Sequence, residues 1–207
     1  MKLNFRKLLP YLLICVVIGF TYFYSDLFIN YDLDGFYGKE VDQKAYNFDL
    51  LSSSGKRVQL TDFGEQFLFL TFGFTRCTSV CPLNLHRFQS LSKKFLEQNL
   101  NVKFIFISFD AFRDNAKEIE DFVSKFSTPN IEGLLSGKDN TLDVATKFKN
   151  YISFNKEKIE ENPNFQINHN GFLYLIDKAS KLRLIYMQKD VDEQKIINDI
   201  KKLSLIK

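Results

Sequence analysis

Cysteine and histidine are scarce in this chain of 207 residues, which has three cysteines and two histidines. Three cysteines are too few for the disulfide framework that stabilises many small secreted domains. The chain also lacks an internal repeat and a low-complexity tract. Hydrophobic residues make up 45% of it and charged residues 26%, close to the averages for folded globular proteins. The composition therefore argues against a disulfide scaffold, a fibrous repeat and wholesale disorder, and it favours one folded domain.

An excess of charge of one sign is absent from most of the chain. The formal net charge is +3, and Lys2, Arg6 and Lys7 account for all of it, because the first 25 residues contain no acid and the remainder has 25 basic and 25 acidic residues. Most nucleic-acid-binding proteins carry a basic patch, because contacts with phosphates supply much of their affinity. We therefore expect no nucleic-acid partner.

Charged residues are also missing from Leu8 to Ser25 (LLPYLLICVVIGFTYFYS), a run of 18 residues. A helix of this length spans about 27 Å, close to the roughly 30 Å of a bilayer's hydrocarbon core. Three basic residues precede the run and Asp26 follows it, so the positive-inside tendency places the N-terminus in the cytoplasm. The sequence predicts one transmembrane helix, with the body of the chain on the other side of the membrane.

A cleaved signal peptide, a lipoprotein signal and a buried core helix are the alternatives for this segment. No small-x-small cleavage site follows the apolar run, and the bulky Ile14 precedes Cys15, where a lipidation site requires a small residue. An Arg-rich and Ser-rich presequence is missing, which favours a bacterial inner membrane over import into an organelle. We expect a cytoplasmic tip and uncleaved anchor at 1–25, a tether at 26–45 and a periplasmic domain at 46–207.

The rest of the chain alternates between short apolar runs and helical patterns. Phe67 to Phe72 and Val102 to Ser108 are almost continuously apolar, as strands buried on both faces are. Apolar residues at steps of three and four predict a helix between them, with Pro82 in its first turn. The other expected elements are a hairpin at 48–51 and 57–60, a helix at about 115–126, a short edge strand at 134–135, a short helix at 141–148, an exposed loop or lid at 153–166, a hairpin at 171–176 and 182–187, and a terminal helix at about 192–203. This order predicts an α/β fold, a mixed sheet flanked by helices.

Two of the three cysteines, Cys77 and Cys81, fall in one turn (TFGFTRCTSVCP) between a predicted strand and the next helix. Turns at strand ends are where α/β proteins build their sites. The positive end of the helix dipole also lowers the pKa of a nearby thiol, which favours the reactive thiolate. This position favours a reactive pair over two small core residues that happen to be cysteine.

The spacing of the pair leaves both redox and metal chemistry open. A redox dithiol usually has two intervening residues, whereas this pair has three. Within one regular helix the two Cβ atoms would lie about 5 to 6 Å apart, beyond the roughly 3.5 to 4.5 Å of a disulfide, but Gly73 and Pro82 suggest a loop that closes the gap. A metal ion tolerates the wider separation. Two thiolates select Cu(I) or Zn(II), and zinc normally recruits a third and a fourth protein ligand.

The two histidines differ in their surroundings. His169 immediately precedes the apolar run 171–176, where its side chain is a candidate third ligand for a metal. A lone histidine at such a position is more often structural. His86 lies one turn into the helix after Cys81, away from the apolar face of that helix, so we expect it on the surface.

Three blocks of the sequence resemble, in the same order, the signature blocks of the Sco/SenC family of membrane-anchored copper proteins. The blocks are 71–82 (TFGFTRCTSVCP), 106–114 (FISFDAFRD) and 167–177 (INHNGFLYLID). The resemblance covers nearly all of the body and implies a thioredoxin-like fold with one copper held by Cys77, Cys81 and His169. It also implies a role in building the dinuclear copper centre of cytochrome c oxidase. The implied partners are the oxidase subunit that carries this centre and other copper chaperones or thiol reductants.

The chain departs from the family pattern at two places near the implied ligands. Thr78 and Ser79 follow the first cysteine, where family members often have Pro-Asp, and Asn168 precedes the histidine, where they commonly have Asp. Neither change removes a ligand, but both remove negative charge near the metal. Asp110 matches a family aspartate, and we consider two roles for it: orienting a ligand from outside the first coordination shell, or capping the following loop or helix.

Two thiolates and one imidazole form a three-coordinate set that suits Cu(I) and leaves a position open for copper transfer; Cu(II) is the second candidate ion. The competing function is thiol-disulfide exchange, with Cys77 and Cys81 as catalytic residues, or redox sensing. A conventional thioredoxin has a cis-proline just before the strand that faces its active-site loop, whereas residues 167–169 read Ile-Asn-His and the nearest proline is Pro163. We therefore favour copper delivery over an enzymatic reductase.

Overall fold

The computed structural model describes residues 10, 13–21, 35–137, 142–153, 155–187 and 191–205. The chain divides into two units, Met1–Gly35 and Phe36–Lys207. Residues 13–21 of the first unit form a helix with exposed side chains. Within the described ranges, no helix is long and apolar enough to span a bilayer. Most other residues of the transmembrane helix predicted at 8–25 lie outside the described part of the chain.

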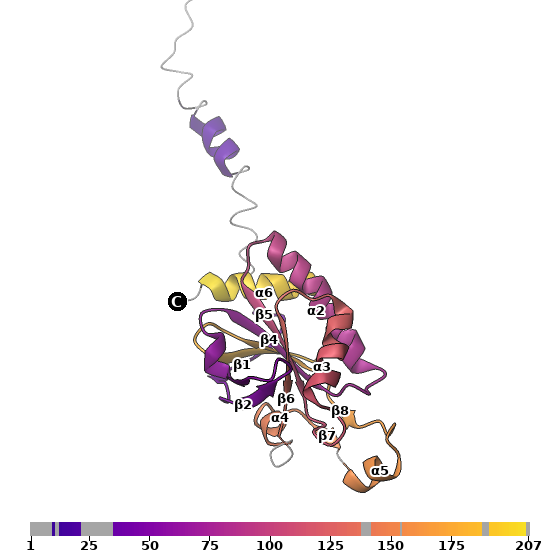
Figure 1. Cartoon of the computed structure of the whole chain (residues 1–207). Coiled ribbons are helices and arrows are strands. Elements are labelled where there is room, and N and C mark those ends of the chain that lie inside the picture. Colours follow the sequence, from indigo (N-terminus) through magenta and orange to yellow (C-terminus); the bar gives the residue numbers. More distant parts are fainter. Residues whose placement is uncertain are drawn as a thin grey trace, which may run out of the picture. The chain divides into compact units, whose positions relative to one another are not determined.

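The second unit is built on an eight-stranded mixed sheet with the order β1-β10-β9-β4-β5-β6-β2-β3 (Figure 1). The central pairs β4–β5 and β5–β6 are parallel, and the other pairs are antiparallel. A separate two-stranded ladder joins β7 and β8. The strands are β1 (Lys39–Lys44), β2 (Asp49–Ser52), β3 (Arg57–Gln59), β4 (Phe67–Gly73), β5 (Val102–Ser108), β6 (Ile131–Leu135), β7 (Ile152–Ser153), β8 (Asn168–His169), β9 (Leu173–Ile176) and β10 (Lys181–Tyr186).

Helices flank this sheet, as the sequence predicted. In Figure 1, α2 lies along one flank beside α3, and α2 also contacts α6 and the central strands β4 and β5. The helices are α2 (Val80–Glu97), α3 (Ala116–Val123), α4 (Asp143–Lys147), α5 (Lys156–Glu161) and α6 (Glu193–Leu205), with 3-10 turns at Leu60–Phe63 and Ser124–Phe126. The predicted helix after Cys77 begins at Val80, so that Cys81 lies in its first turn.

The apolar runs form the centre of the sheet because both of their faces are covered. All seven residues of β4 are buried, and so are six of the seven in β5. Phe69 of β4 contacts the rings of Phe88 and Phe95 from α2, Phe104 from β5 and Tyr186 from β10. Each buried side chain of this size contributes about 1.5 to 3 kcal/mol. Because β4 and β5 are parallel, their C-terminal ends meet at one edge of the sheet, where the loops that follow them lie together.

The structure corrects the expected tether at 26–45, because part of it is folded. Lys39–Lys44 form β1, an edge strand that pairs antiparallel with β10, and the folded unit begins at Phe36 rather than at residue 46. The strand has four charged residues and an irregular register, with Asp42 at φ 42°. An edge strand has one neighbour and exposes much of its surface, so it needs no apolar alternation and gives a weak sequence pattern.

Two further expectations change. The segment expected as an edge strand at 134–135 is part of β6, which lies between β5 and β2, because the hairpin β2–β3 adds to its outer side. The expected loop or lid at 153–166 contains α5, which the side chain of Asn155 caps and whose Ile159 is buried. A single buried residue in a six-residue helix leaves too little periodicity to detect.

Candidate metal centre

Cys77 and Cys81 lie where β4 ends and α2 begins, and both are free and buried. Gly73, the last residue of β4, makes this close packing possible. A Cβ atom on Gly73 would lie 2.5 Å from Sγ of Cys81 and 2.7 Å from the ring of Phe106, which is shorter than any van der Waals contact. The strand end therefore needs a residue without a side chain so that the first turn of α2 can approach it.

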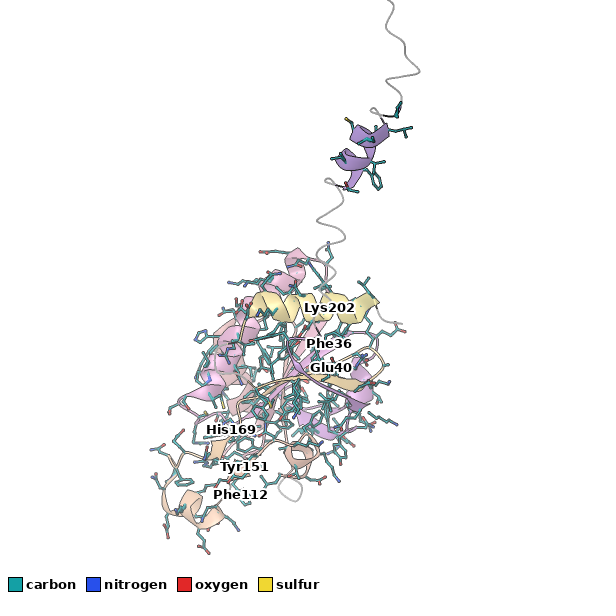
Figure 2. The ribbon with its side chains drawn as sticks, turned by 180° about the vertical axis from the view of Figure 1, so that it is seen from behind. Phe36, Glu40, Phe112, Tyr151, His169 and Lys202 are labelled. Atoms are coloured by element: carbon teal, nitrogen blue, oxygen red, sulfur yellow. The ribbon has the colours of Figure 1, made fainter. Side chains whose placement is uncertain are left out.

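His169 reaches the two cysteines from β8, about 90 residues further along the chain. Its Nε2 lies 3.4 Å from Sγ of Cys81 and 3.8 Å from Sγ of Cys77. The three potential ligand atoms all lie within 4.8 Å of one another. His169 and Tyr151 are neighbours in Figure 2, because the N–H of Asn170 donates to the carbonyl of Tyr151 beside the β7–β8 ladder. The fold thus brings together the two cysteines and the histidine that the sequence singled out.

The backbone fixes which nitrogen of His169 faces the sulfurs. Nδ1 lies 2.9 Å from the carbonyl oxygen of Asn170, which can only accept a hydrogen bond, so Nδ1 carries a hydrogen. Nε2 is then the nitrogen that would bind a metal ion held between the histidine and the two sulfurs. Metal-binding histidines are commonly oriented in this way, with the second nitrogen bonded to a carbonyl or a carboxylate.

Two aromatic rings enclose the imidazole. Phe74 and Phe109, the first residues after β4 and β5, meet His169 edge to face, with ring centroids 5.8 Å and 5.1 Å away. Both phenylalanines are fully buried. Apolar walls lower the local dielectric and hold the ring in one orientation, which strengthens electrostatic interactions within the site.

The two thiols ionise very differently. A hydrogen bond from the side chain of Cys81 is the main cause that lowers the pKa of Cys77 to about 3, and burial opposes it. A hydrogen bond from the side chain of His169 and the backbone N–H groups of Ser79 and Cys81 lower it further. Burial raises the pKa of Cys81 well above its usual value. Without a metal, the pair is therefore a thiolate at Cys77 held by a thiol at Cys81. This arrangement provides one soft anionic donor at once and a second when a metal displaces the proton.

Asp114 anchors the loop that carries Cys77, a role that the sequence did not reveal. Its buried carboxylate accepts hydrogen bonds from the backbone N–H of Thr75 (2.9 Å), from the hydroxyl of Thr75 (2.6 Å) and from the hydroxyl of Ser108 (2.6 Å). Burial raises the pKa of Asp114, and the hydrogen bonds from Ser108 and Thr75 oppose that shift. The loop after β4 is thereby fixed to the end of β5, two residues before Cys77.

Asp110, the expected supporting residue, does not contact any of the three potential ligands through a hydrogen bond of the described residues. Its carboxylate accepts from Nε of Arg113 at 2.5 Å, and the two side chains are almost fully buried. Arg113 also donates to the carbonyls of Pro163 and Phe165, both at 2.9 Å. Asp110 thus acts on the segment that precedes His169, and it does so through Arg113.

A cleft of about 250 Å³ opens beside the site, between the start of α2 and the segment that carries His169. Its lining residues are Cys77–Val80 and Gln166–His169. Cys77 is only 6% exposed, so the cleft is its route to solvent. His86, the second histidine, is exposed on α2, as expected. Its ring packs edge to face on the ring of Phe126, with the two centroids 4.9 Å apart.

Comparisons with known proteins agree with this site. A model of the SCO1/SenC family matches residues 38–205. The protein sco1 of Schizosaccharomyces pombe is 29% identical over 147 residues, which are 70% of this chain and 56% of that protein. The chain therefore spans little more than half the length of this relative.

Two solved structures show the same fold. The copper-bound ScoI of Arabidopsis thaliana has a TM-score of 0.67 at 24% identity, covering 76% of this chain and 96% of that one. BsSco, described as a member of the Sco family of cytochrome c oxidase assembly proteins with a disulfide switch, has a TM-score of 0.67 at 24% identity, covering 82% of this chain and 98% of that one. These likenesses confirm the thioredoxin-like α/β fold. Because the family model matches most of its length, the chain belongs to the SCO1/SenC family.

Proposed function

We propose that this protein binds copper as Cu(I) through Cys77, Cys81 and His169 and delivers it to the dinuclear copper centre of cytochrome c oxidase. The observation that carries the proposal is the convergence of two sulfurs and one imidazole nitrogen within 4.8 Å of one another. Two thiolates and an imidazole are donors that soft Cu(I) prefers. The copper-bound relative from Arabidopsis and the description of BsSco support the choice of metal and of target.

The cleft beside Cys77 supports delivery over permanent storage. A three-coordinate ion has a free coordination position, and the cleft leads to Cys77 from solvent. A cysteine or histidine of a receiving protein that enters this space can bind the ion before the donor ligands leave. Such stepwise ligand exchange avoids releasing the free ion. The residues that form the cleft therefore face the receiving partner in this proposal.

The proposed position of the domain is the periplasmic side of a bacterial inner membrane, with the N-terminal segment as a single-pass anchor. The support is the uncharged run at Leu8 to Ser25 with Lys2, Arg6 and Lys7 before it. Alkaline phosphatase fused after Lys207 of the full chain should be active. Green fluorescent protein fused at the same residue and exported by the Sec pathway should not fluoresce. The reverse pattern would contradict this topology, and release of the protein by high-salt washing would contradict the anchor.

Copper binding is tested by anaerobic titration of the reduced protein with Cu(I) against a calibrated chelator. The wild type should bind one equivalent, and X-ray absorption should show two sulfurs and one nitrogen around the ion. His169→Ala should weaken the affinity or change the spectrum, because two thiolates alone lack the third donor. His86→Ala is the matched control, because His86 is exposed and remote from the sulfurs. A His169→Ala variant identical to the wild type would refute the ligand role.

Thiol-disulfide exchange is the second candidate function, and the contrast between the two thiols favours it. A thiolate at Cys77 beside a thiol at Cys81 is the arrangement that attacks a disulfide and then resolves the mixed disulfide. In that case His169 would be dispensable, whereas each cysteine would be essential.

An oxidase assay in cells that lack the protein separates the two functions. If the protein delivers copper, Cys77→Ser and His169→Ala should both lower cytochrome c oxidase activity, with the defect at the dinuclear copper centre, and added copper should ease both defects. A membrane tether would add to this effect by raising the local donor concentration. If His169→Ala has normal activity while Cys77→Ser is inactive with or without copper, thiol exchange is the correct function.

A further inference from the structure

Gln166 contacts the backbone on both sides of Cys77. Its Nε2 donates to the carbonyl of Arg76 at 2.9 Å, and its Oε1 accepts from the N–H of Thr78 at 3.3 Å. The same Nε2 lies 3.1 Å from the carbonyl of Asn164, which orients the amide group. One side chain therefore holds the two peptide groups that flank Cys77.

The segment that carries Gln166 also carries His169. Ile167, between them, is 3% exposed and fixes the segment to the core, and β8 pairs with β7 immediately afterwards. The segment therefore meets the loop of Cys77 at two points: the imidazole faces the sulfur, and the amide of Gln166 holds the backbone. Their relative position is fixed because only two residues separate them.

Cys77 depends on this contact more than Cys81 does. Cys81 lies in the first turn of α2, whereas Cys77 lies in the preceding loop. Asp114 joins that loop, through Thr75, to Ser108 at the end of β5. Among the described residues of the segment 163–169, Gln166 is the residue whose side chain hydrogen-bonds to the backbone of residues 76–79.

We propose that Gln166 is a positioning residue of the metal centre, which holds Cys77 against His169 and thereby sets the rate at which copper leaves. This role rests on the proposed function. The side chain of Gln166 is exposed and lines the cleft between the two segments that it joins. Water or a docking partner can therefore replace its hydrogen bonds. Loss of these bonds frees the loop of Cys77 from the histidine and widens the cleft through which a receiving protein reaches the ion.

The test uses Gln166→Ala in the full chain, with Gln194→Ala as the matched control. Gln194 is an exposed glutamine on α6 whose side chain donates to Asn198. Transfer of Cu(I) to bicinchoninate should be about 3- to 10-fold faster from Gln166→Ala, the effect of losing one or two exposed hydrogen bonds. X-ray absorption should show a wider spread of copper–sulfur distances in this variant. Gln194→Ala should transfer copper as the wild type does.

A second measurement needs no copper. The N–H of Thr78 donates to Gln166, so its hydrogen exchange, followed by NMR in the reduced apoprotein, should be faster in Gln166→Ala and unchanged in Gln194→Ala. If Thr78 exchanges faster in Gln166→Ala and the wild type binds no Cu(I), the contact of Gln166 is supported and the copper function is refuted. Copper transfer and Thr78 exchange equal to those of the wild type would overturn the role of Gln166 and leave copper binding intact. Faster transfer with unchanged Thr78 exchange and an unchanged copper shell would also overturn it.

Discussion

At the residue scale, the pKa values of the buried thiols of Cys77 and Cys81 shift in opposite directions, because each thiol changes the environment of the other. The thiol of Cys81 donates to Cys77 and favours the anion there. The resulting anion then adds to burial in keeping Cys81 protonated. One nucleophile and one proton donor result from two chemically identical side chains, and the deeper burial of Cys81 makes it the proton donor.

This difference predicts the pH dependence of alkylation. With a pKa of about 3, Cys77 is a thiolate throughout pH 5 to 8, so its rate constant with iodoacetamide should be nearly constant over that range. An ordinary thiol reacts about tenfold faster per pH unit there. Cys81→Ala removes the main hydrogen-bond donor and should restore a rate that rises with pH. Peptide mapping by mass spectrometry separates the alkylation of Cys77 from that of Cys15. A steep pH dependence of the Cys77 rate constant in the wild type would contradict the lowered pKa of Cys77.

The buried pair of Arg113 and Asp110 gives a second prediction at this scale. Arg113→Lys keeps the charge but cannot reach Asp110 and the carbonyls of Pro163 and Phe165 together, because lysine lacks the planar fork of donors. We expect a loss of about 2 to 4 kcal/mol in the free energy of unfolding by urea.

The exposed ion pair of Lys117 and Asp121 on α3 is the comparison for this variant. Lys117→Ala should leave the free energy of unfolding nearly unchanged, because water screens an exposed pair. Equal losses in Arg113→Lys and Lys117→Ala would show that the segment before His169 does not depend on Arg113.

At the scale of elements, the site depends on how closely α2 approaches the end of β4. Asn84 of α2 donates to the hydroxyl of Thr71 on β4 (3.0 Å) and to the carbonyl of Gly171 (3.1 Å). A Cβ atom at Gly171 would lie 2.0 Å from Val80. The helix is thus held to the strand and to the loop after His169 by one buried amide, with glycines at the two points of closest approach.

Gly73→Ala tests this packing. The new methyl group would overlap Sγ of Cys81 and the ring of Phe106, so α2 or the strand end must shift. We expect a loss of about 1 to 3 kcal/mol in stability, as for other overpacked cores, together with weaker Cu(I) binding because Cys81 moves. Gly64→Ala is the control, since its Cβ would meet only the carbonyl of Thr61 at 3.6 Å. Copper affinity unchanged in Gly73→Ala would show that Cys81 tolerates the shift.

At the scale of the whole molecule, Asp199 joins the beginning of the folded unit to its last helix. Its carboxylate accepts from the N–H groups of Tyr37 and Gly38 and from the hydroxyl of Tyr186, all at 3.0 Å. Asp199 lies on α6 and is 1% exposed. Burial raises the pKa of Asp199 above its usual value, and the three hydrogen bonds oppose that shift. This contact fixes the residues that lead into β1, which pairs with β10 at the edge of the sheet.

The raised pKa of Asp199 fixes the sign of a pH effect. In the unfolded chain the pKa of an Asp is about 3.9, and in the folded protein the pKa of Asp199 is higher. Between these two pKa values, the carboxyl group of Asp199 binds more protons in the folded state than in the unfolded state. Its contribution to the free energy of unfolding therefore falls as pH rises through this window. Asp199→Asn loses acceptors for its donors and should cost about 1 to 3 kcal/mol. The difference between wild type and variant in urea unfolding should be larger at pH 4 than at pH 7. A stability difference between wild type and Asp199→Asn that grows toward pH 7 would contradict the raised pKa of Asp199.

The sequence by itself determined the elements with strong local patterns. The apolar runs of β4 and β5, the amphipathic α2 and the hairpin of β9 and β10 all follow from residues close together in the chain. The pair of cysteines in one strand-to-helix turn, and the three blocks that resemble the SCO1/SenC family, also identified Cys77, Cys81 and His169. The mixed sheet flanked by helices was correct for the same reason, because alternation of strands and helices is a local property.

Only the tertiary structure decided which distant groups meet. The charged strand β1, the inner position of β6 and the helix α5 have weak local patterns, and each is fixed by neighbours far away in sequence. The contacts of Asp114, Arg113 and Gln166 around the site were likewise absent from the sequence analysis. Their hydrogen bonds join segments about 40 to 90 residues apart. Local periodicity reports which face of an element is buried, whereas the partner of a polar side chain depends on how the completed sheet brings the loops together.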